Sequence, residues 1–523
     1  MSYESALEYI HAVRWQGHRP GLDRTRALLA ALGNPQKQLR FVHIAGTNGK
    51  GSTAAMLDSC LRAAGYHTGL FTSPFINRFN ERIQVDGIPI GDGELEELVE
   101  RIRPAADAMA DVPTEFEIIT ALGMLYFARK HCDLVVLEVG LGGELDSTNV
   151  IDPPECAVIT ALGMDHVKEL GPTLADIARA KAGIIKPGSP VVSYGGAPEA
   201  DAVIEQTAAQ QGAPLTAVDF SRLRVGEGSL EAVSFGFDGL EGLRLPLVGS
   251  YQPRNAAVAI TALRVLRTRG WTIPDEAIRQ GLAGVRWPGR FEVLREQPVF
   301  LLDGSHNAHG MRATVESLRA RLPGQKPVFL LSIMADKDVD EMLRLLLPLA
   351  EGFVTVAAHT PRAQHADIAL DLDAVGLHGA HKADAVGVVA DPLPCGGKAH
   401  HIDRAVVAGG PVQSVQAVDD PHLVGDGDVK AVQRKELRQS LFQLLGRNLA
   451  DLIVDLLPQL PGQQPVQLRR EGVSKRVAQN GKLFHSKSSS FPSVRGYTEN
   501  SLAYPGGHDK IFGRKNQKRA LFL

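Results

Sequence analysis

The chain has 523 residues, of which 44% are hydrophobic, and this length corresponds to two or three domains of roughly 150 residues each. A single small binding module is therefore excluded. The 56 Lys and Arg residues nearly balance the 59 Asp and Glu residues, and the formal net charge of −3 offers no basic field that would attract nucleic acid. We therefore expect small-molecule partners and no nucleic-acid partner.

The sequence shows neither a transmembrane segment nor a signal peptide. No apolar run reaches the roughly 18 residues that a transmembrane helix needs, and the first residues lack the basic and apolar regions of a signal peptide. The four cysteines are far apart, which is typical of a reducing compartment and argues against a structural zinc site. We expect a cytoplasmic monomer with no membrane partner.

Short apolar runs alternate with segments of helical period from about residue 40 onward. Strands are predicted at 39–44, 67–71, 134–139, 157–162 and 190–194, and helices at 52–65, 115–130 and 174–185. The strands are rich in Val, Ile and Leu without polar alternation, as in a parallel sheet that is covered on both faces. This pattern predicts an α/β fold of the P-loop type, with a doubly wound, mostly parallel sheet, over residues 1–296.

A second, smaller α/β domain is predicted to begin at residue 297. Strands at 299–303, 327–334 and 352–358 alternate with helices at 310–322 and 340–349, as in a Rossmann-like domain. The pattern stops near residue 363, so this domain looks incomplete.

Residues 364–523 differ in composition from the rest of the chain. Between Gln364 and Leu483 the only aromatic residue is Phe442, which leaves little material for a core. One helix is predicted between Leu437 and Leu456, where leucines recur on one face. The residues after Gln463 are basic and rich in serine, and we expect a tail of low order.

The segment G-T-N-G-K-G-S carries the clearest chemical signal. It lies between a predicted strand and a predicted helix, and it consists of Gly46, Thr47, Asn48, Gly49, Lys50, Gly51 and Ser52. Glycines let the backbone curl around an anion, the following helix offers its positive end, and a lysine offsets phosphate charge. The spacing differs from the common P-loop pattern, since an extra glycine precedes the serine. A nucleoside triphosphate site is favoured over an ordinary glycine-rich turn.

Polar residues follow two further buried strands. Glu138 interrupts an apolar strand near its carboxyl end, where a magnesium ion beside the phosphates would offset the cost of burying a carboxylate. Asp165 and His166 end the next strand, and parallel strands present their carboxyl ends together. Lys181 lies in the helix that follows. Alone, His166 and Lys181 would more often be a loop histidine and a surface lysine, and the less favoured alternative for Glu138 is a glutamate at the sheet rim bound to loop amides.

Seven segments together resemble the folylpolyglutamate synthase/dihydrofolate synthase family of the Mur ligase superfamily, over residues 1 to about 363. In chain order they are G-T-N-G-K-G-S, T-S-P-F-I-N-R-F-N-E-R-I, L-E-V-G-L-G-G-E-L-D-S-T-N, G-M-D-H, K-A-G-I-I-K-P-G, W-P-G-R-F-E and D-G-S-H-N. The resemblance implies an ATP-binding central domain at 1–296 and the start of a glutamate-ligase-like domain at 297–363. It also implies an ATP-dependent ligase, which joins L-glutamate to the carboxylate of folate or dihydropteroate through an acyl phosphate.

The resemblance also implies a role for individual residues. The glycine loop would bind the phosphates, with Lys50 on the transferred group, and Ser73, Glu138 and His166 would bind two magnesium ions. Lys181 matches a lysine that is carbamylated in the family. Further nucleotide-binding positions are Asn255, Arg290, Asp303 and His306, and the pterin pocket would include Pro20, Gly21, Thr114, Glu115 and Phe116.

The chain departs from the family pattern in three places. Phe75 and Glu144 stand where relatives usually have His and Arg, and nothing after Ala363 supplies the family's ending. Our hypothesis is that residues 364–523 result from a frameshift, a rearrangement or a gene-model error. Two alternatives to a folate ligase follow: a non-catalytic remnant that still binds ATP or folate, and a Mur-type ligase acting on a UDP-muramyl peptide.

Overall fold

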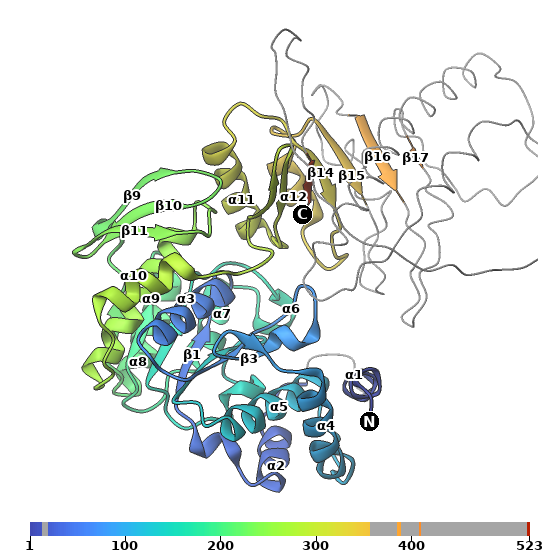
Figure 1. The fold of residues 1–523 in the computed structure, drawn as a ribbon, viewed down its shortest axis with the longest axis vertical. Helices are drawn as coiled ribbons and strands as arrows, with labels where there is room; N and C mark the ends of the chain where they lie inside the picture. The colour runs from blue at the N-terminus through green and yellow to red at the C-terminus, as the bar shows by residue number, and fades with distance from the viewer. Residues whose placement is uncertain (13–18, 356–383, 389–406, 409–519, 523) are drawn as a thin grey trace, which may run out of the picture. The chain divides into compact units, whose positions relative to one another are not determined.

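The computed structural model describes residues 1–12, 19–355, 384–388, 407–408 and 520–522 (Figure 1). All of them belong to one structural unit, formed by Met1–Pro411 and Gln517–Leu523. The helix predicted between Leu437 and Leu456 lies outside the described residues. No helix in the described ranges is long and apolar enough to cross a membrane.

The first sheet has eight strands in the order β4-β3-β2-β5-β1-β6-β7-β8. Its parallel strands are β2 (Thr68–Phe71), β5 (Leu134–Glu138), β1 (Phe41–Ala45), β6 (Cys156–Ile159), β7 (Val191–Ser193) and β8 (Leu215–Ala217). An antiparallel edge is added by β3 (Ile83–Val85) and β4 (Ile88–Pro89). The predicted α/β class and the mostly parallel sheet are confirmed.

Helices cover both faces of this sheet, so the side chains of the central strand β1 are buried on both faces. Val42 and Ile44 pack into one hydrophobic cluster, whereas Phe41 packs into another on the opposite face. The first face carries α3 (Lys50–Ala63), α9 (Gln252–Thr268) and α10 (Asp275–Gly284). The opposite face carries α1 (Tyr3–His11), α2 (Asp23–Ala31), α4 (Asp92–Asp107), α5 (Glu115–Arg129), α7 (Leu174–Ala182) and α8 (Pro198–Gln210).

A small antiparallel sheet, not predicted from the sequence, packs beside α10 (Figure 1). It consists of β9 (Leu223–Gly228), β10 (Val233–Phe237) and β11 (Leu240–Leu245). β9 is almost wholly exposed, so its sequence has no apolar run that would mark a strand. Phe235 and Phe237 of β10 instead add to the core under α3 and α9.

The second large sheet has the order β12-β13-β18-β14-β15-β16-β17. Its strands are β12 (Glu292–Glu296), β13 (Val299–Leu302), β14 (Val328–Leu331), β15 (Gly352–Thr355), β16 (Asp384–Val388), β17 (Val407–Ala408) and β18 (Ala520–Phe522). α11 (Ala308–Arg321) and α12 (Val339–Leu346) contribute to its core. Three short strands thus come from beyond residue 363, and β18 pairs in parallel with both β13 and β14.

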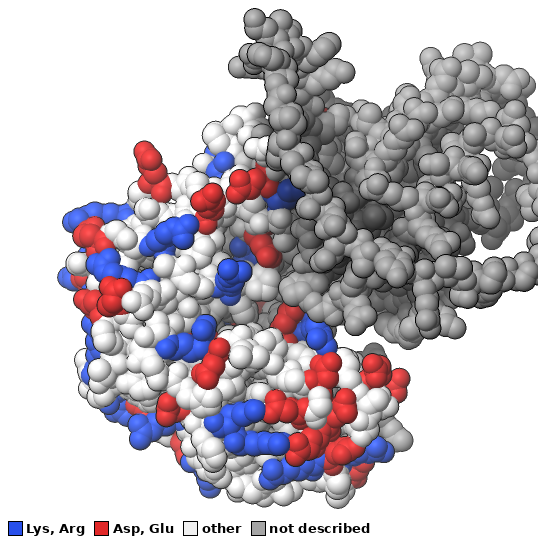
Figure 2. Space-filling view, in the orientation of Figure 1, with Lys and Arg blue, Asp and Glu red and all other residues white. Residues whose placement is uncertain are grey.

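The charged side chains are of both signs on the face shown in Figure 2. Lys and Arg alternate there with Asp and Glu over the described residues, and neither sign forms a continuous patch. This surface agrees with the near balance of charge in the whole sequence.

Candidate active site

The glycine loop follows β1 and leads directly into α3, as predicted. Gly46 has a φ of 152° and Gly49 a φ of 87°, which favour glycine. A Cβ atom on Gly46 would lie 1.9 Å from Thr160 Oγ1, so no larger residue fits. The Thr47 and Asn48 amides both donate to the Ala161 carbonyl oxygen, at 3.0 and 3.1 Å. The loop is therefore fixed to the end of β6, and the first turn of α3 supplies N–H groups for an anion.

Two lysines converge on one carbonyl oxygen of this loop. Lys50 Nζ donates to the Gly46 oxygen at 3.1 Å and Lys181 Nζ donates to the same oxygen at 2.9 Å. Lys181 extends from α7 and is only 5% exposed. Burial, together with the charge of Lys50, lowers the pKa of Lys181 to about 7. A large share of Lys181 is therefore neutral near pH 7.

Glu138 ends β5 next to the glycine loop, since it pairs in register with Ile44 of β1. The carboxylate is 3% exposed, and Oε2 accepts a hydrogen bond from the Ser73 amide at 3.1 Å. Burial raises the pKa of Glu138, although the charges of Lys50, Arg290 and Arg82 act in the opposite direction. A buried carboxylate with this environment suits a cation as an additional partner.

His166 directly precedes the short helix α6 (Val167–Leu170) and has a left-handed φ of 51°. Its neighbour Asp165 is engaged elsewhere: Lys337 Nζ lies 2.9 Å from Oδ1 and Asn307 Nδ2 donates to Oδ2 at 3.0 Å. Burial acts to raise the pKa of Asp165, but the hydrogen bond from Lys337 and the charges of His166 and Lys337 outweigh it and lower the pKa to about 2. Asp165 therefore joins the two α/β domains as a carboxylate.

The donor set is compatible with magnesium. The described part of the chain holds no group of three or more His, Cys, Asp or Glu side chains arranged as a complete metal site. Magnesium often takes one or two carboxylates and completes its shell with water and phosphate oxygens. Glu138 and the hydroxyls of Ser52 and Ser73 are oxygen donors of the kind that such an ion prefers.

Asn255 lies against the glycine loop from α9. Its Oδ1 is 2.6 Å from the position that a Cβ atom on Gly49 would take, and its Nδ2 donates to Gln252 Oε1 at 3.0 Å. Gln252 in turn donates to Ser52 Oγ at 3.2 Å. The structure therefore brings Asn255 to the loop, and Gln252, which the sequence analysis missed, connects the two.

The remaining predicted nucleotide residues surround the start of the second domain. Asp303 is 2% exposed and accepts hydrogen bonds from the Phe291 amide at 2.7 Å and the Thr314 hydroxyl at 2.9 Å. Arg290 donates to the Gly289 oxygen at 3.1 Å. His306 Nδ1 lies 2.9 Å from the Gly304 oxygen. Asp303 thus fixes the backbone of the W-P-G-R-F-E segment that carries Arg290.

Two residues of the second domain reach the glycine loop and were not predicted. Asn48 Nδ2 lies 2.7 Å from His309 Nδ1, and the Asn48 and Asn307 side chains exchange hydrogen bonds of 3.3 and 3.2 Å. Asn307 ends the D-G-S-H-N segment, so its position beside His306 could have indicated it. The sequence holds no comparable signal for His309.

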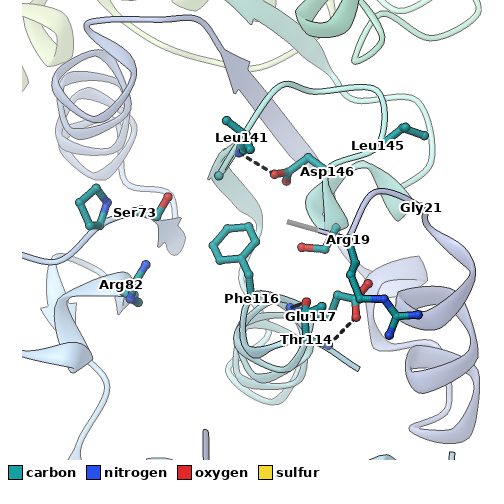
Figure 3. A pocket seen from close by; sticks show the side chains of 13 residues that line it. Arg19, Gly21, Ser73, Arg82, Thr114, Phe116, Glu117, Leu141, Leu145 and Asp146 are labelled. Atoms are coloured by element: carbon teal, nitrogen blue, oxygen red, sulfur yellow. Dashed lines mark hydrogen bonds between the residues drawn. The ribbon is translucent and has the colours of Figure 1, made fainter. Parts of the chain in front are cut away.

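A cavity of about 300 Å³ opens beside Ser73. Figure 3 shows the Phe116 ring within it, with Ser73 and Arg82 on one side and Gly21 and Arg19 on the other. Of the predicted pterin residues, Gly21, Thr114 and Phe116 line the cavity, whereas Pro20 and Glu115 do not. The lining residues that the sequence analysis missed are Arg19, Pro74, Arg82, Glu117, Gly140, Leu141, Leu145, Asp146 and Ser147.

Asp146 is a buried carboxylate in the wall of this cavity. Its Oδ2 accepts from the Leu141 amide at 2.8 Å, and its Oδ1 accepts from the Thr148 hydroxyl at 2.5 Å. Thr148 Oγ1 also lies 2.9 Å from Nε2 of the fully buried His43. Burial lowers the pKa of His43 to about 3, so this imidazole is neutral and holds Thr148 in place.

Comparison with known proteins identifies the family. The sequence model of the Mur ligase middle domain matches residues 44–263, and that of the Mur ligase glutamate ligase domain matches residues 289–392. The dihydrofolate synthase/folylpolyglutamate synthase of Bacillus subtilis is 42% identical over 69% of this chain and 86% of its own length. The folylpolyglutamate synthase of Lacticaseibacillus casei is 40% identical, with 69% of this chain and 87% of that protein covered.

A solved structure described as a complex of folylpolyglutamate synthase with AMPPCP and folate has a TM-score of 0.64 at 39% identity. The match covers 69% of this chain and 90% of that chain. The two matched domains thus belong to a known type of enzyme. The chain is a member of the folylpolyglutamate synthase/dihydrofolate synthase family of Mur ligases, and it is an ATP-dependent ligase.

Proposed function

We propose that this chain joins L-glutamate to the carboxylate of a folate, and also of dihydropteroate, at the expense of ATP. One observation carries the proposal: Ser73 lines the cavity beside Phe116 while its amide bonds the buried Glu138 next to the glycine loop. A carboxylate at the inner end of the cavity would therefore lie beside the phosphates of ATP.

The chemistry requires two transfers. The substrate carboxylate attacks the γ-phosphorus of ATP, and the bond to the β-γ bridging oxygen breaks, giving an acyl phosphate and ADP. The glutamate amine then attacks the acyl carbon, phosphate leaves, and the amine loses a proton. Phosphoryl transfer depends mainly on positioning and charge neutralisation, which suits Lys50 and the amino end of α3. We assign Asn255, Arg290, Asp303 and His306 to the nucleotide side of this site.

Ser73, Glu138 and His166 are the residues that would hold two magnesium ions, with Ser52 assisting. When bound, magnesium would neutralise the charge of the phosphates. The support from this chain is the buried carboxylate of Glu138, whose pKa is raised by burial and which would be stabilised by a cation.

Lys181 is proposed to react with carbon dioxide. The neutral amine attacks the carbon of CO₂, a carbamate forms, and one proton is released. The pKa of about 7 supports this, because much of the amine is already in the neutral, reactive form near pH 7. A carbamate would also relieve the repulsion between Lys181 and Lys50 at the Gly46 oxygen. Carbon-13 NMR of the protein in ¹³C-bicarbonate should show a carbamate signal that is absent from Lys181→Met.

The cavity is proposed to hold the pterin ring. Phe116 offers a flat face for stacking, and Asp146 offers a carboxylate to ring N–H groups. Gly21 and Thr114 also line the cavity. Pro20 and Glu115 do not line it, but they are adjacent in sequence to Gly21 and Thr114, and we assign them to the same pocket. We further propose a monomer in the cytoplasm. The three described cysteines are buried free thiols, which fits a reducing compartment.

The test is a ligation assay on the full chain with ATP, L-glutamate and either tetrahydrofolate or dihydropteroate, with the products identified by mass spectrometry. ADP release that depends on both glutamate and the folate supports the proposal. Lys50→Met is the negative control and should lower kcat by roughly a hundredfold or more. ATP binding without turnover with either substrate would instead indicate a non-catalytic remnant.

A further inference from the structure

A short chain of hydrogen bonds joins the second domain to the middle of the glycine loop. It consists of Asn48 in the loop, Asn307, which caps α11, and His309 in the first turn of α11. Asn48 directly precedes Gly49, whose left-handed φ of 87° turns the backbone toward α3. The Asn48 amide is bonded to Ala161 of the first domain, whereas its side chain is bonded to the second. Asn48 is therefore held from both domains.

The direction of these hydrogen bonds follows from one backbone amide. Asn307 Oδ1 accepts from the Gly310 amide at 2.7 Å, so its Nδ2 is the group that donates to Asn48 Oδ1 at 3.2 Å. The Nδ2 group of Asn48 must then face Nδ1 of His309, at 2.7 Å. An N–H group needs an acceptor, so Nδ1 of His309 carries no proton and the ring proton lies on Nε2.

The surroundings of His309 keep its imidazole neutral and in place. Burial lowers the pKa of His309, and the charge of Arg312 acts in the same direction, whereas that of Glu316 opposes it. The ring also packs on Gly163, where a Cβ atom would lie 3.2 Å from its Cγ. The Gly163 amide donates to Thr47 Oγ1 at 3.2 Å, and this hydroxyl lies 3.0 Å from the Gly163 oxygen. His309 thus meets the glycine loop by a second route, through the segment that follows β6.

The segment that carries these residues also carries two that we assign to the nucleotide. Asp303 and His306 precede Asn307 directly in the chain, so the contact with the glycine loop sets the spacing between the two halves of the ATP site. We propose that His309 is a positioning residue for ATP, which acts through Asn48 to hold the phosphate-binding loop against the second domain. The inference deepens the proposed function and rests on its assignment of ATP to these residues.

The test separates the acceptor from the rest of the ring. His309→Asn keeps an acceptor bonded to Cγ, where Nδ1 is, whereas His309→Leu keeps the bulk and loses the acceptor. Binding of the ATP analogue AMPPCP with magnesium to the full chain is measured by calorimetry. His309→Leu should weaken binding about fivefold, the effect of one neutral hydrogen bond, and His309→Asn should restore it. His67→Leu is the matched control: it loses bonds to Asp86 and the Lys130 oxygen at the amino end of β2 and should bind as wild type.

Steady-state kinetics distinguishes positioning from a general loss of structure. His309→Leu should raise KM for ATP about fivefold and leave KM for the folate unchanged. Equal increases in both, or AMPPCP binding by His309→Asn as weak as that by His309→Leu, would overturn the inference. If His309→Leu does not fold, His309→Gln replaces it and should show the same loss, because its amide lies one bond further out. Failure of wild type to bind AMPPCP would overturn the nucleotide assignment itself, so the two failures are distinguishable.

Discussion

Lys181 shows how burial prepares one amine for chemistry. Its Nζ shares the Gly46 oxygen with Lys50, yet only Lys181 is almost fully buried. The family resemblance indicated this lysine, but sequence alone would assign it to the surface, because a single lysine in a helix carries no burial signal. Its environment comes from the packing of α7 against the glycine loop.

The Lys181→Met variant should remove a pH dependence of stability. The folded-state pKa of about 7 lies below the ordinary value of 10.5, so the unfolded chain binds more protons between these pH values. Wild-type stability should therefore rise from pH 7 to pH 10 in CO₂-free buffer, and the variant should lack this rise. Thermal unfolding at both pH values measures it. Lys168→Met, on the exposed face of α6, is the control and should behave as wild type.

At the level of elements, five of the eight strands of the first sheet were predicted, whereas the short edge strands β3, β4 and β8 were not. The buried parallel strands β1, β2, β5, β6 and β7 all lie within or beside their predicted ranges, because continuous apolar runs are a strong signal. The antiparallel β9–β11 sheet was missed, since exposed strands with glycines lack such runs. The glycine loop was correctly placed, whereas its attachment to Ala161 could not be predicted from local sequence.

The connection between β1 and α3 should tolerate no side chain at Gly46. Gly46→Ala places a Cβ atom 1.9 Å from Thr160 Oγ1, so the loop or β6 must shift. We expect ATP affinity to fall by at least about tenfold, measured by calorimetry, because the phosphate-binding backbone moves. Gly65→Ala is the matched control: its φ is also positive, at 90°, but nothing lies within 4 Å. It should cost roughly 1 kcal/mol of stability and leave ATP binding intact; equal losses in both variants would contradict this.

At the scale of the whole molecule, the C-terminal segment 364–523 is the part that least resembles the family. The glutamate ligase domain match stops at residue 392, and 86% of the Bacillus subtilis relative is covered by 69% of this chain. The division into residues 1–296, 297–363 and 364–523 remains a proposal, and the family match runs into the first part of the last segment, as far as residue 392. Translation of the coding DNA beyond the Ala363 codon in the other frames should recover a family-like ending. Replacing residues 364–523 with that recovered ending should raise kcat above that of the present chain. If no frame encodes such an ending, the hypothesis is contradicted.

The contact between the two α/β domains depends on residues far apart in sequence, which no local pattern could reveal. Lys337 and Asp165 are 172 positions apart, and both side chains are 9% exposed. Such an ion pair offsets the cost of burying each charge, so removing one partner leaves the other unpaired. It therefore ties the loop between β6 and α6, beside His166, to the segment that follows β14.

Lys337→Met should destabilise the protein by roughly 3 kcal/mol at pH 7, because it leaves Asp165 buried without its cation. The folded-state pKa of Asp165, about 2, lies below the ordinary 3.8, so its contribution is present above about pH 4 and is lost as pH falls through 2. The loss caused by Lys337→Met should accordingly shrink in acid. Arg312→Met is the matched control, since its pair with Glu341 is exposed and lies within one domain. Denaturant unfolding at pH 7 and pH 3 measures both; an equal, pH-independent loss in the two variants would show that Asp165 and Lys337 do not stabilise the domain contact.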